Sequence, residues 1–446
     1  MTSKDSVYAR FGVDFGKEHD VVEIFKALFR ATKGNVADLE ALGITLPTDI
    51  GFFSDGLEID VAKLHGALDV KRISMPMGTD GAGTKPLVHT LYRMLGGDDE
   101  LHRASVGIDT VAMVANDVAC GGGRVVALND YVAWTNPNVE ITRDLAEGLL
   151  IGANACKSVI IGGENASLRE MVRGVPPPGH QLYVGNVGLT FNLRALGRWM
   201  KDRLKGDYDP SMIPFDYDVG QGYDISATGI GLYPHPENDD AVLDGRNIKA
   251  GDVIIGIRSS GVHCNGISAA RQLIDYAPAG WYGPLNPERH IPQFDGRTIL
   301  EEILTPTLIY NNLIEALNET EQLRGVVNIT GEGVHNLERL LHQRGFGADL
   351  DFSNVEQPHE IFDVIQSHTK IPIREMYEDF NMGQGMYLVV REEDVDAVLG
   401  QINETANPIL GETYKAEVLG HVCNDGAGRI NVTAHNKQRF EYEPAA

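Results

Sequence analysis

Residues 75–85 hold the feature that most limits how this chain can fold: an acidic, glycine-rich loop directly after a short apolar alternation. The alternation predicts a strand that ends near Gly78. Gly81 and Gly83 then allow positive φ and let an anion approach the backbone amides closely. Since ligands of α/β proteins gather where strands meet loops, the stretch predicts an α/β chain with a binding site here.

The polar side chains of this loop suit a phosphate site. Asp80 offers a hard oxygen ligand of the kind that Mg²⁺ prefers, and Lys85, after Thr84, offers a compact cation for phosphate. The alternative is a plain turn that merely needs glycine. The loop is neither a Walker A sequence nor a dinucleotide fingerprint, because the chain's Gly-Lys pair is followed by Glu18 and no Gly-x-Gly pair continues to a third glycine.

A helix predicted over residues 106–119 carries a second polar group. Asp109 and Asn116 are two turns apart and project from nearly the same face, and Asp117 follows about a quarter-turn round. Their oxygens suit a metal or a phosphate-bound cation. An N-cap at Asp109 and a C-terminal turn at 116–117 is the other interpretation, and the residues alone do not separate the two.

Other elements complete a first domain. An amphipathic helix near 21–29 carries Lys26, which by itself is a solvated surface lysine. Strands are predicted at 125–132, 158–161 and 183–191, and a helix at 142–156. Glu164 follows two glycines at a strand end, so it is either a ligand or part of a turn. Residues 192–247 lack periodicity, which is typical of a lid, an interface or an inserted arm.

A second domain begins with a strand at 252–258, a small polar loop at 259–266 and a helix at 267–276. Free N–H groups and the helix dipole make this an anion-binding arrangement. His263 in the loop contacts phosphate or moves a proton, or is simply a satisfied polar residue. Further helices are predicted at 306–318, 334–342 and 392–403, further strands at 325–329 and 386–390, and a strand pair near 416–423 and 429–433.

Composition limits the partners and the compartment. The net charge of −25 argues against nucleic acid, although a small anionic substrate is compatible with it where cations or helix N-termini are local. The four cysteines lie far apart, which offers no zinc site or disulfide framework and suits a reducing compartment. No apolar run approaches the ~18 residues of a membrane helix. We therefore expect a cytoplasmic protein of two or three domains.

An ordered set of motifs runs through most of the chain. It includes Gly-Thr-Asp-Gly-Ala-Gly-Thr-Lys at 78–85, Asn-Asp at 116–117, Gly-Gly-Glu at 162–164, Ser-Ser-Gly-Val-His-Cys-Asn-Gly at 259–266, Ile-Thr-Gly at 329–331 and Glu-Met-Tyr at 375–377. In this order the motifs resemble those of the phosphoribosylformylglycinamidine cyclo-ligase family, also called aminoimidazole ribonucleotide synthetase.

The resemblance implies a fold and a reaction. The fold is a two-domain α/β (α+β) subunit whose N-terminal sheet pairs into a barrel across a homodimer, followed by a C-terminal mixed α/β domain. The implied division is 1–191 for ATP binding and dimerisation, 192–247 as an insertion or linker, and 248–446 for substrate and phosphate. The implied reaction uses ATP and Mg²⁺ to close the imidazole ring of formylglycinamidine ribonucleotide, a small nucleotide substrate.

The resemblance also implies residue roles. Asp80 and Asp117 would hold Mg²⁺–ATP, with Asp109 and Asn116 in support. Lys85 and Lys26 would neutralise phosphate charge. His263 and Asn265 would act near the transferring phosphoryl group or the substrate phosphate. The catalytic set is thus His263, Asp117 and Lys26, and the nucleotide set is Asp80, Gly81, Gly83, Thr84, Lys85, Asp109, Asn116, Glu164 and Asn265.

The chain departs from the family pattern at several places. Asn328 stands where the family has a histidine, and residues 165–169 read Asn-Ala-Ser-Leu-Arg in place of Thr-Ala-Glu-Met-Pro. Residues 35–55 lack the family's glycine-rich run, and 192–247 is longer than its usual link. These departures keep two alternatives open: a related ATP-using enzyme with another substrate, such as a selenophosphate synthetase or a thiamine phosphate kinase, and a nucleotide-binding paralogue without turnover.

Overall fold

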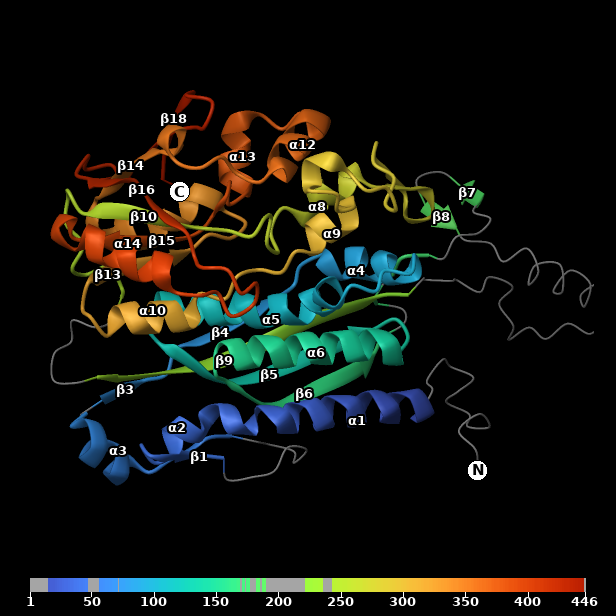
Figure 1. Cartoon of the computed structure of the whole chain (residues 1–446), viewed down its shortest axis with the longest axis horizontal. Coiled ribbons are helices and arrows are strands. Elements are labelled where there is room, and N and C mark those ends of the chain that lie inside the picture. The colour runs from blue at the N-terminus through green and yellow to red at the C-terminus, as the bar shows by residue number, and fades with distance from the viewer. Residues whose placement is uncertain are drawn as a thin grey trace, which may run out of the picture.

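The computed structural model describes residues 15–46, 56–70, 72–168, 171–172, 174–176, 182–184, 187–189, 221–235 and 243–444. They form two α/β domains, each built on its own sheet (Figure 1). Within these ranges, no helix combines the length and the apolar character needed to cross a bilayer.

The N-terminal domain carries helices α1 (Phe15–Ala31), α2 (Ala37–Glu40), α3 (Val61–Leu68), α4 (Lys85–Met94), α5 (Glu100–Cys120) and α6 (Val139–Ala155). Its strands are β1 (Ile44–Thr45), β2 (Glu58–Ile59), β3 (Arg72–Ser74), β4 (Met77–Gly81), β5 (Arg124–Trp134), β6 (Val159–Ser167), β7 (Leu182–Val184), β8 (Val187–Leu189) and β9 (Tyr223–His235).

The C-terminal domain carries helices α8 (Ile267–Ala270), α9 (Ile299–Leu304), α10 (Asn311–Asn318), α11 (Glu338–Leu341), α12 (Glu360–Thr369), α13 (Ile373–Asp379) and α14 (Val395–Glu404). Its strands are β10 (Val253–Arg258), β11 (Asp275–Tyr276), β12 (Trp281–Tyr282), β13 (Leu323–Asn328), β14 (Gly347–Asp351), β15 (Gln384–Val390), β16 (Ala416–Cys423), β17 (Ile430–Thr433) and β18 (Arg439–Tyr442).

The N-terminal sheet has the order β3-β9-β5-β6, and β4 also pairs with β9. Strands β5 and β6 are parallel, whereas β9 is antiparallel to β3, β4 and β5. This corrects the predicted boundary, because 223–235 belongs to this sheet and not to a linker. The strand was missed because small residues dilute its apolar alternation. They have a packing reason: a Cβ on Gly229 would lie 2.4 Å from Val114 Cγ1 of α5.

One face of this sheet is covered by α5, α6 and α1, which share a single apolar core with β5, β6 and β9 (Figure 1). Helix α5 begins six residues earlier than predicted, where Asp99 caps it by accepting a hydrogen bond from the His102 N–H at 3.1 Å. Asp109 therefore lies inside the helix, which rules out the N-cap interpretation. Strand β4 likewise extends past Gly78 to Gly81, so Asp80 belongs to the strand.

The predicted strand at 183–191 is replaced by β7 and β8, which pair with each other; residues 190–191 lie outside the described ranges. The described strands of one chain form an open sheet and not a closed barrel.

The C-terminal sheet has the order β13-β15-β10-β16-β14-β17-β18. Helices α10 and α14 cover one face at β13, β15 and β10, and the larger apolar core fills the other face. The predicted pair at the end of the chain is wrong in detail, because β16 and β17 both pair with β14 between them. The predicted helix at 267–276 ends at Ala270, and the one at 334–342 is α-helical only over α11.

Gly148→Ala tests the close contact between α5 and α6. A Cβ at this position would lie 2.0 Å from the Ala104 carbonyl oxygen, so the helices must separate, and we expect a loss of about 3 kcal/mol or more in the free energy of unfolding. Gly66→Ala in α3 is the matched control, because nothing lies within 4 Å of its added Cβ and it should be neutral or stabilising by up to about 1 kcal/mol. Equal unfolding midpoints for the two variants would contradict the packing argument.

Candidate functional site

A cavity of about 460 Å³ lies where the end of β4 faces the loop after β10. We call it the Asp80 cavity; it is lined by Asp80, Gly81, Gly83, Met113, Asp224, Ile225, Ser226, Cys264 and Asn265. The structure thus brings together the predicted residues Asp80, Gly81, Gly83 and Asn265 from two domains. Their roles in binding remain predictions.

The backbone around Asp80 is shaped by glycine. Gly81 lies so close to β9 that a Cβ would come within 2.8 Å of the Ile225 carbonyl oxygen. Gly83 has a φ of +57°, and its Cβ would lie 3.2 Å from the Cys264 carbonyl oxygen. Both positions therefore require glycine, one for close approach and one for the left-handed conformation as well.

Asp80 is a half-buried carboxylate. Its Oδ1 accepts a hydrogen bond from the Gly81 N–H at 2.7 Å. Burial raises the pKa of this carboxyl above its ordinary value, the Gly81 bond opposes the shift, and the negative charge of Asp117 adds to it. Two like charges close enough to interact form an arrangement that a cation relieves.

Asp117 is exposed at the end of α5 and is held by the second domain. Its Oδ1 accepts a hydrogen bond from Asn328 Nδ2 at 2.9 Å, and the Asn328 N–H points at Cys120 Sγ at 3.2 Å. The residue that replaces the family's histidine is therefore a neutral donor that orients one of the two predicted metal ligands.

Asp224 is a cavity residue that the sequence analysis missed. It lies at the start of β9, next to the buried Tyr223, and its side chain is exposed. The signal available in the sequence was an acidic residue shortly before a run of small residues. It was overlooked because 192–247 was assigned to an insertion or linker.

Lys85 and Asp109 do not line the cavity. Lys85 Nζ lies 2.8 Å from Asp109 Oδ2, and both side chains are 0% exposed. The ammonium also donates to the Thr305 carbonyl oxygen at 2.8 Å, and Asp109 Oδ1 accepts from the Thr307 N–H at 2.7 Å. The Lys85 ammonium is therefore buried and paired within the protein in this structure, and its phosphate contact stays a prediction.

Asn116 also binds a segment of the second domain. We call Lys85, Asp109 and Asn116, together with the segment 305–310 that they bind, the interdomain clamp. Its Nδ2 donates to the Leu308 carbonyl oxygen at 2.9 Å, and its Oδ1 accepts from the Tyr310 N–H at 2.8 Å. Residues 306–310 form neither helix nor strand, whereas the sequence predicted helix there. Asp109 and Asn116 of α5 therefore bind a segment of the second domain.

His263 belongs to the 259–266 loop, but its side chain is buried and does not line the Asp80 cavity. Its ring is 3% exposed, Nε2 accepts from the Ser260 N–H at 3.2 Å, and its φ is +58°. Burial lowers the pKa of this imidazole from 6.5 to about 3, and the nearby positive charge of Lys85 acts in the same direction. His263 is thus buried outside the lining of the Asp80 cavity, and its catalytic role stays a prediction.

Asn265, two residues further on, does reach the cavity. Gly331 of the next strand-to-helix loop lies beside it, since a Cβ there would be 3.3 Å from Asn265 Oδ1. Ser260 Oγ donates to the Pro306 carbonyl oxygen at 2.5 Å, which ties this loop to the clamped segment. The clamp therefore sets how the loop faces Asp80.

The remaining predicted residues lie elsewhere in the chain. Thr84 is the N-cap residue of α4 but makes no side-chain capping bond. Lys26 Nζ pairs with Glu23 Oε1 at 3.0 Å on α1, which packs against α6 and β6. Glu164 is exposed on β6 opposite Tyr131. Strands β9 and β5 separate β6 from β4, so these two residues do not meet Asp80 within one subunit.

The donor set fits Mg²⁺ carried by a nucleotide. Among the described residues there is no cluster of three or more histidine, cysteine or acidic side chains that would build a complete cage. Mg²⁺ typically takes one or two protein carboxylates and completes its octahedron with phosphate oxygens and water. Asp80 and Asp117, close enough to shift a pKa, are such a pair.

Two family models match the chain. The model described as AIR synthase related protein, N-terminal domain, matches residues 66–188, and the corresponding C-terminal domain matches residues 249–433. The second match begins close to β10, where the structure begins its second sheet.

Curated proteins and solved structures are also similar. Phosphoribosylformylglycinamidine cyclo-ligase of Methanothermobacter thermautotrophicus is 33% identical over 338 residues, 76% of this chain and 79% of that protein. The cyclo-ligase of Pyrococcus horikoshii is 28% identical, covering 94% and 95%. Hydrogenase maturation protein HypE in complex with ATP has a TM-score of 0.53 at 16% identity, covering 92% and 93%, and thiamine-monophosphate kinase from Stenotrophomonas maltophilia has 0.54 at 14%, covering 91% and 95%. These structures show the fold.

Asn116→Ala tests the clamp. The substitution leaves the buried Leu308 carbonyl and Tyr310 N–H without a partner, so we expect the free energy of unfolding to fall by about 2–4 kcal/mol. Thermal and urea unfolding measure the loss. Asn129→Ala, at an exposed position of β5, is the control and should stay within about 0.5 kcal/mol; a loss as large as that of Asn116→Ala would show that the effect is not specific to the clamp.

His263→Gln tests the neutral imidazole. Since the pKa in the folded state lies below that of the unfolded chain, the unfolded state binds the proton more readily between pH 6.5 and about 3, and stability is lost as the pH falls below 6.5. Between pH 7.5 and 5 this contribution amounts to about 2 kcal/mol, which the variant should lack. Urea unfolding at both pH values measures it, with His421→Gln, at an exposed ring, as the control. An unchanged pH dependence in His263→Gln would refute the assignment.

Proposed function

The chain belongs to the phosphoribosylformylglycinamidine cyclo-ligase family, and we propose that it performs that family's reaction, the ATP-dependent ring closure of formylglycinamidine ribonucleotide in purine biosynthesis. It is an ATP-dependent ligase. The products are 5-aminoimidazole ribonucleotide, ADP and phosphate.

The chemistry explains why a nucleotide site is needed. An amide oxygen leaves poorly until it is phosphorylated, so ATP activates the formyl oxygen before a nitrogen of the amidine side attacks that carbon. Phosphoryl transfer depends on positioning and charge stabilisation more than on covalent help from the protein. The site must therefore hold a triphosphate in line with the substrate and exclude water.

The Asp80 cavity carries this proposal. Asp80, with Asp117 nearby, presents carboxylates from the first domain, and the loop at 259–266 faces them from the second. Asp80 and Asp117 would hold the Mg²⁺ that accompanies ATP, whose charge screens the phosphates and polarises the transferring group. Asn265 would donate a hydrogen bond to a phosphoryl or substrate oxygen. Gly81 and Gly83 line the cavity, and a phosphate would approach their backbone there.

Other residues act by position. The Lys85–Asp109 pair and Asn116 would keep the second-domain loop at a fixed distance from Asp80. His263, buried and neutral, would support that loop from below. Asp224, which also lines the cavity, would add a carboxylate for the nucleotide's cation or the ribose hydroxyls.

We place the active unit in a homodimer whose N-terminal sheets face each other. The sheet face opposite α5 and α6 is exposed only in part: Met77 is 67% exposed and Tyr131 is 40% exposed, whereas Val36, Leu39 and Ile44 pack on Val159 and Ile161 at the other end of this face. A row across this sheet joins Gly81, Ser226, Tyr131 and Glu164 as cross-strand partners. A second sheet against this row would form the barrel and give Glu164 a ligand-facing position. We also place the enzyme in the cytoplasm, which its four free cysteines support.

Turnover by the purified protein tests the function directly. With formylglycinamidine ribonucleotide and Mg²⁺–ATP, we expect the aminoimidazole product together with ADP. Formation of ADP only with another substrate would replace the proposal by a related enzyme, and saturable ATP binding without turnover would replace it by a binding protein.

Asp80→Asn tests the site. Removing a carboxylate that holds the metal–nucleotide should lower kcat/KM for ATP by about 100-fold or more while leaving the unfolding midpoint unchanged. Asp275→Asn, at an exposed position of β11, is the matched control and should behave as wild type. Wild-type kinetics of Asp80→Asn would remove Asp80 from the site.

A further inference from the structure

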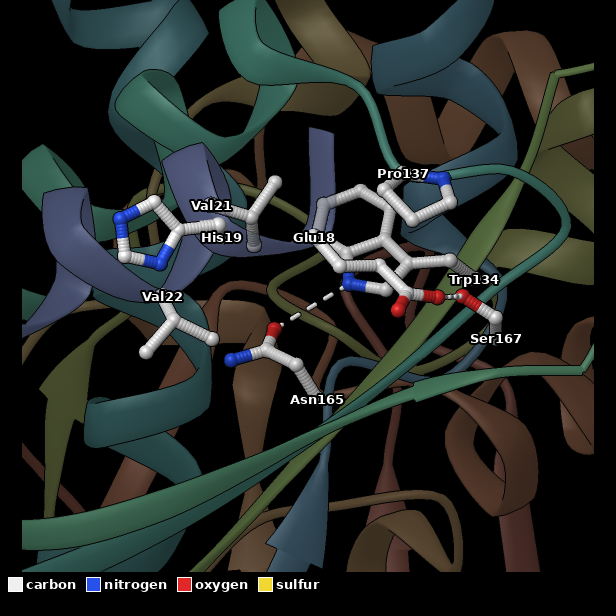
Figure 2. A pocket seen from close by; sticks show the side chains of 8 residues that line it. All are labelled: Glu18, His19, Val21, Val22, Trp134, Pro137, Asn165 and Ser167. Atoms are coloured by element: carbon white, nitrogen blue, oxygen red, sulfur yellow. Dashed lines mark hydrogen bonds between the residues drawn. The ribbon is translucent and has the colours of Figure 1, made fainter. Parts of the chain in front are cut away.

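A second cavity, of about 420 Å³, opens at the same end of the N-terminal sheet, beneath the first turns of α1 (Figure 2). We call it the Trp134 pocket; it is lined by Glu18, His19, Val21, Val22, Trp134, Pro137, Asn165 and Ser167. Trp134 pairs with Tyr223 across β5 and β9, and Asp224 lines the Asp80 cavity. The pocket and the cavity thus lie on either side of this buried aromatic row.

The polar groups of the pocket are held in place. Trp134 is 1% exposed, and its Nε1–H donates to Asn165 Oδ1 at 3.2 Å. Ser167 Oγ donates to Glu18 Oε1 at 2.6 Å. Figure 2 shows the Asn165 nitrogen turned away from the indole, and Glu18 and Ser167 meeting beside it. Both acceptor and donor orientations are therefore fixed before any ligand enters.

The fixed contacts leave one donor group and one acceptor facing outward. Within the part of the chain that the structure describes, Asn165 Nδ2 and the second carboxylate oxygen of Glu18 have no hydrogen-bond partner. Apolar surface from Val21, Val22 and Pro137 flanks them, and the described lining contains no lysine or arginine. Such a site disfavours phosphate and favours a flat, uncharged ring that carries both a donor and an acceptor.

We propose that the Trp134 pocket binds a 6-aminopurine ring, with the exocyclic amino group donating to Glu18 and the adjacent ring nitrogen accepting from Asn165. The choice of an adenine compound among flat heterocycles rests on the proposed use of ATP; the existence of the site rests on the pocket itself. Asn165 and Ser167 both lie in the segment 165–169, where the chain departs from the family pattern.

The ring has two sources, ATP itself or a separate adenine nucleoside. Glu18, Val22 and Lys26 follow one stripe of α1, and Lys26 lies about 12 Å along the helix axis from Glu18. A nucleotide seated by its base could therefore direct its phosphates along this stripe. A free nucleoside would need the pocket alone.

Calorimetric titration with adenosine, which lacks phosphates, tests the pocket. We expect saturable binding to wild type and to Asp80→Asn, and a loss of at least about tenfold in affinity for Glu18→Gln and for Asn165→Leu. Inosine, which lacks the amino group, should bind at least about tenfold more weakly than adenosine. Asp20→Asn, an exposed acidic residue of the same helix, is the matched control and should bind as wild type.

Several results would overturn the proposal: no adenosine binding to wild type, equal affinity for inosine, or unchanged affinity in both pocket variants. Ser167→Ala keeps the test valid if Asn165→Leu fails to fold. This substitution removes the hydrogen bond that holds Glu18 but leaves the proposed ring contacts in place. It should weaken adenosine binding, because the Glu18 carboxylate becomes mobile. Competition between adenosine and ATP assigns the ring to ATP, and simultaneous binding assigns it to a separate nucleoside.

The outcome is separable from the proposed function. Cyclo-ligase turnover with no adenosine binding would refute the pocket and leave the enzyme assignment intact. Adenosine binding without turnover on formylglycinamidine ribonucleotide would refute the enzyme assignment and leave the pocket intact.

Discussion

A buried ion pair between Lys85 and Asp109, both in the first domain, helps to fix the position of the second domain against the first. Both side chains are 0% exposed, and a pair of this kind stabilises only if its remaining hydrogen-bonding capacity is met, because desolvation of two charges is costly. Here the carbonyl oxygen of Thr305 accepts one hydrogen bond from Lys85, and the N–H of Thr307 donates one to Asp109. The charges thereby fix backbone from the second domain against α5 of the first (Figure 1).

The geometry of the Asp80 cavity follows from this contact. The clamped segment continues into Pro306, whose carbonyl oxygen receives the Ser260 hydroxyl, and the Ser260 loop carries Asn265 to the cavity. Acidic groups therefore come from one domain and a neutral loop from the other. In the proposed function, a cation bound with the triphosphate would neutralise the carboxylates, and Asn265 would approach a phosphoryl oxygen.

Much of the architecture could be read from local pattern. Helices α5 and α6 and strands β5, β10 and β15 have strong apolar periodicity and lie within a few residues of their predicted positions, with α5 starting six residues early. β9 and the irregular segment 306–310 were missed for physical reasons. Small residues in β9 fit under α5 and carry no apolar signal, and 306–310 is bound by side chains distant in sequence.

The sequence by itself determined the motifs that place the chain in its family, the glycines at 81 and 83 beside Asp80, and the helical spacing of Asp109 and Asn116. Only the tertiary structure decided what those side chains contact. Spacing shows which groups share a face, but whether that face meets solvent, a ligand or another domain depends on the packing of distant segments. The same polar pattern on α5 therefore became an interdomain clamp, while Asp224, with no motif around it, reached the cavity.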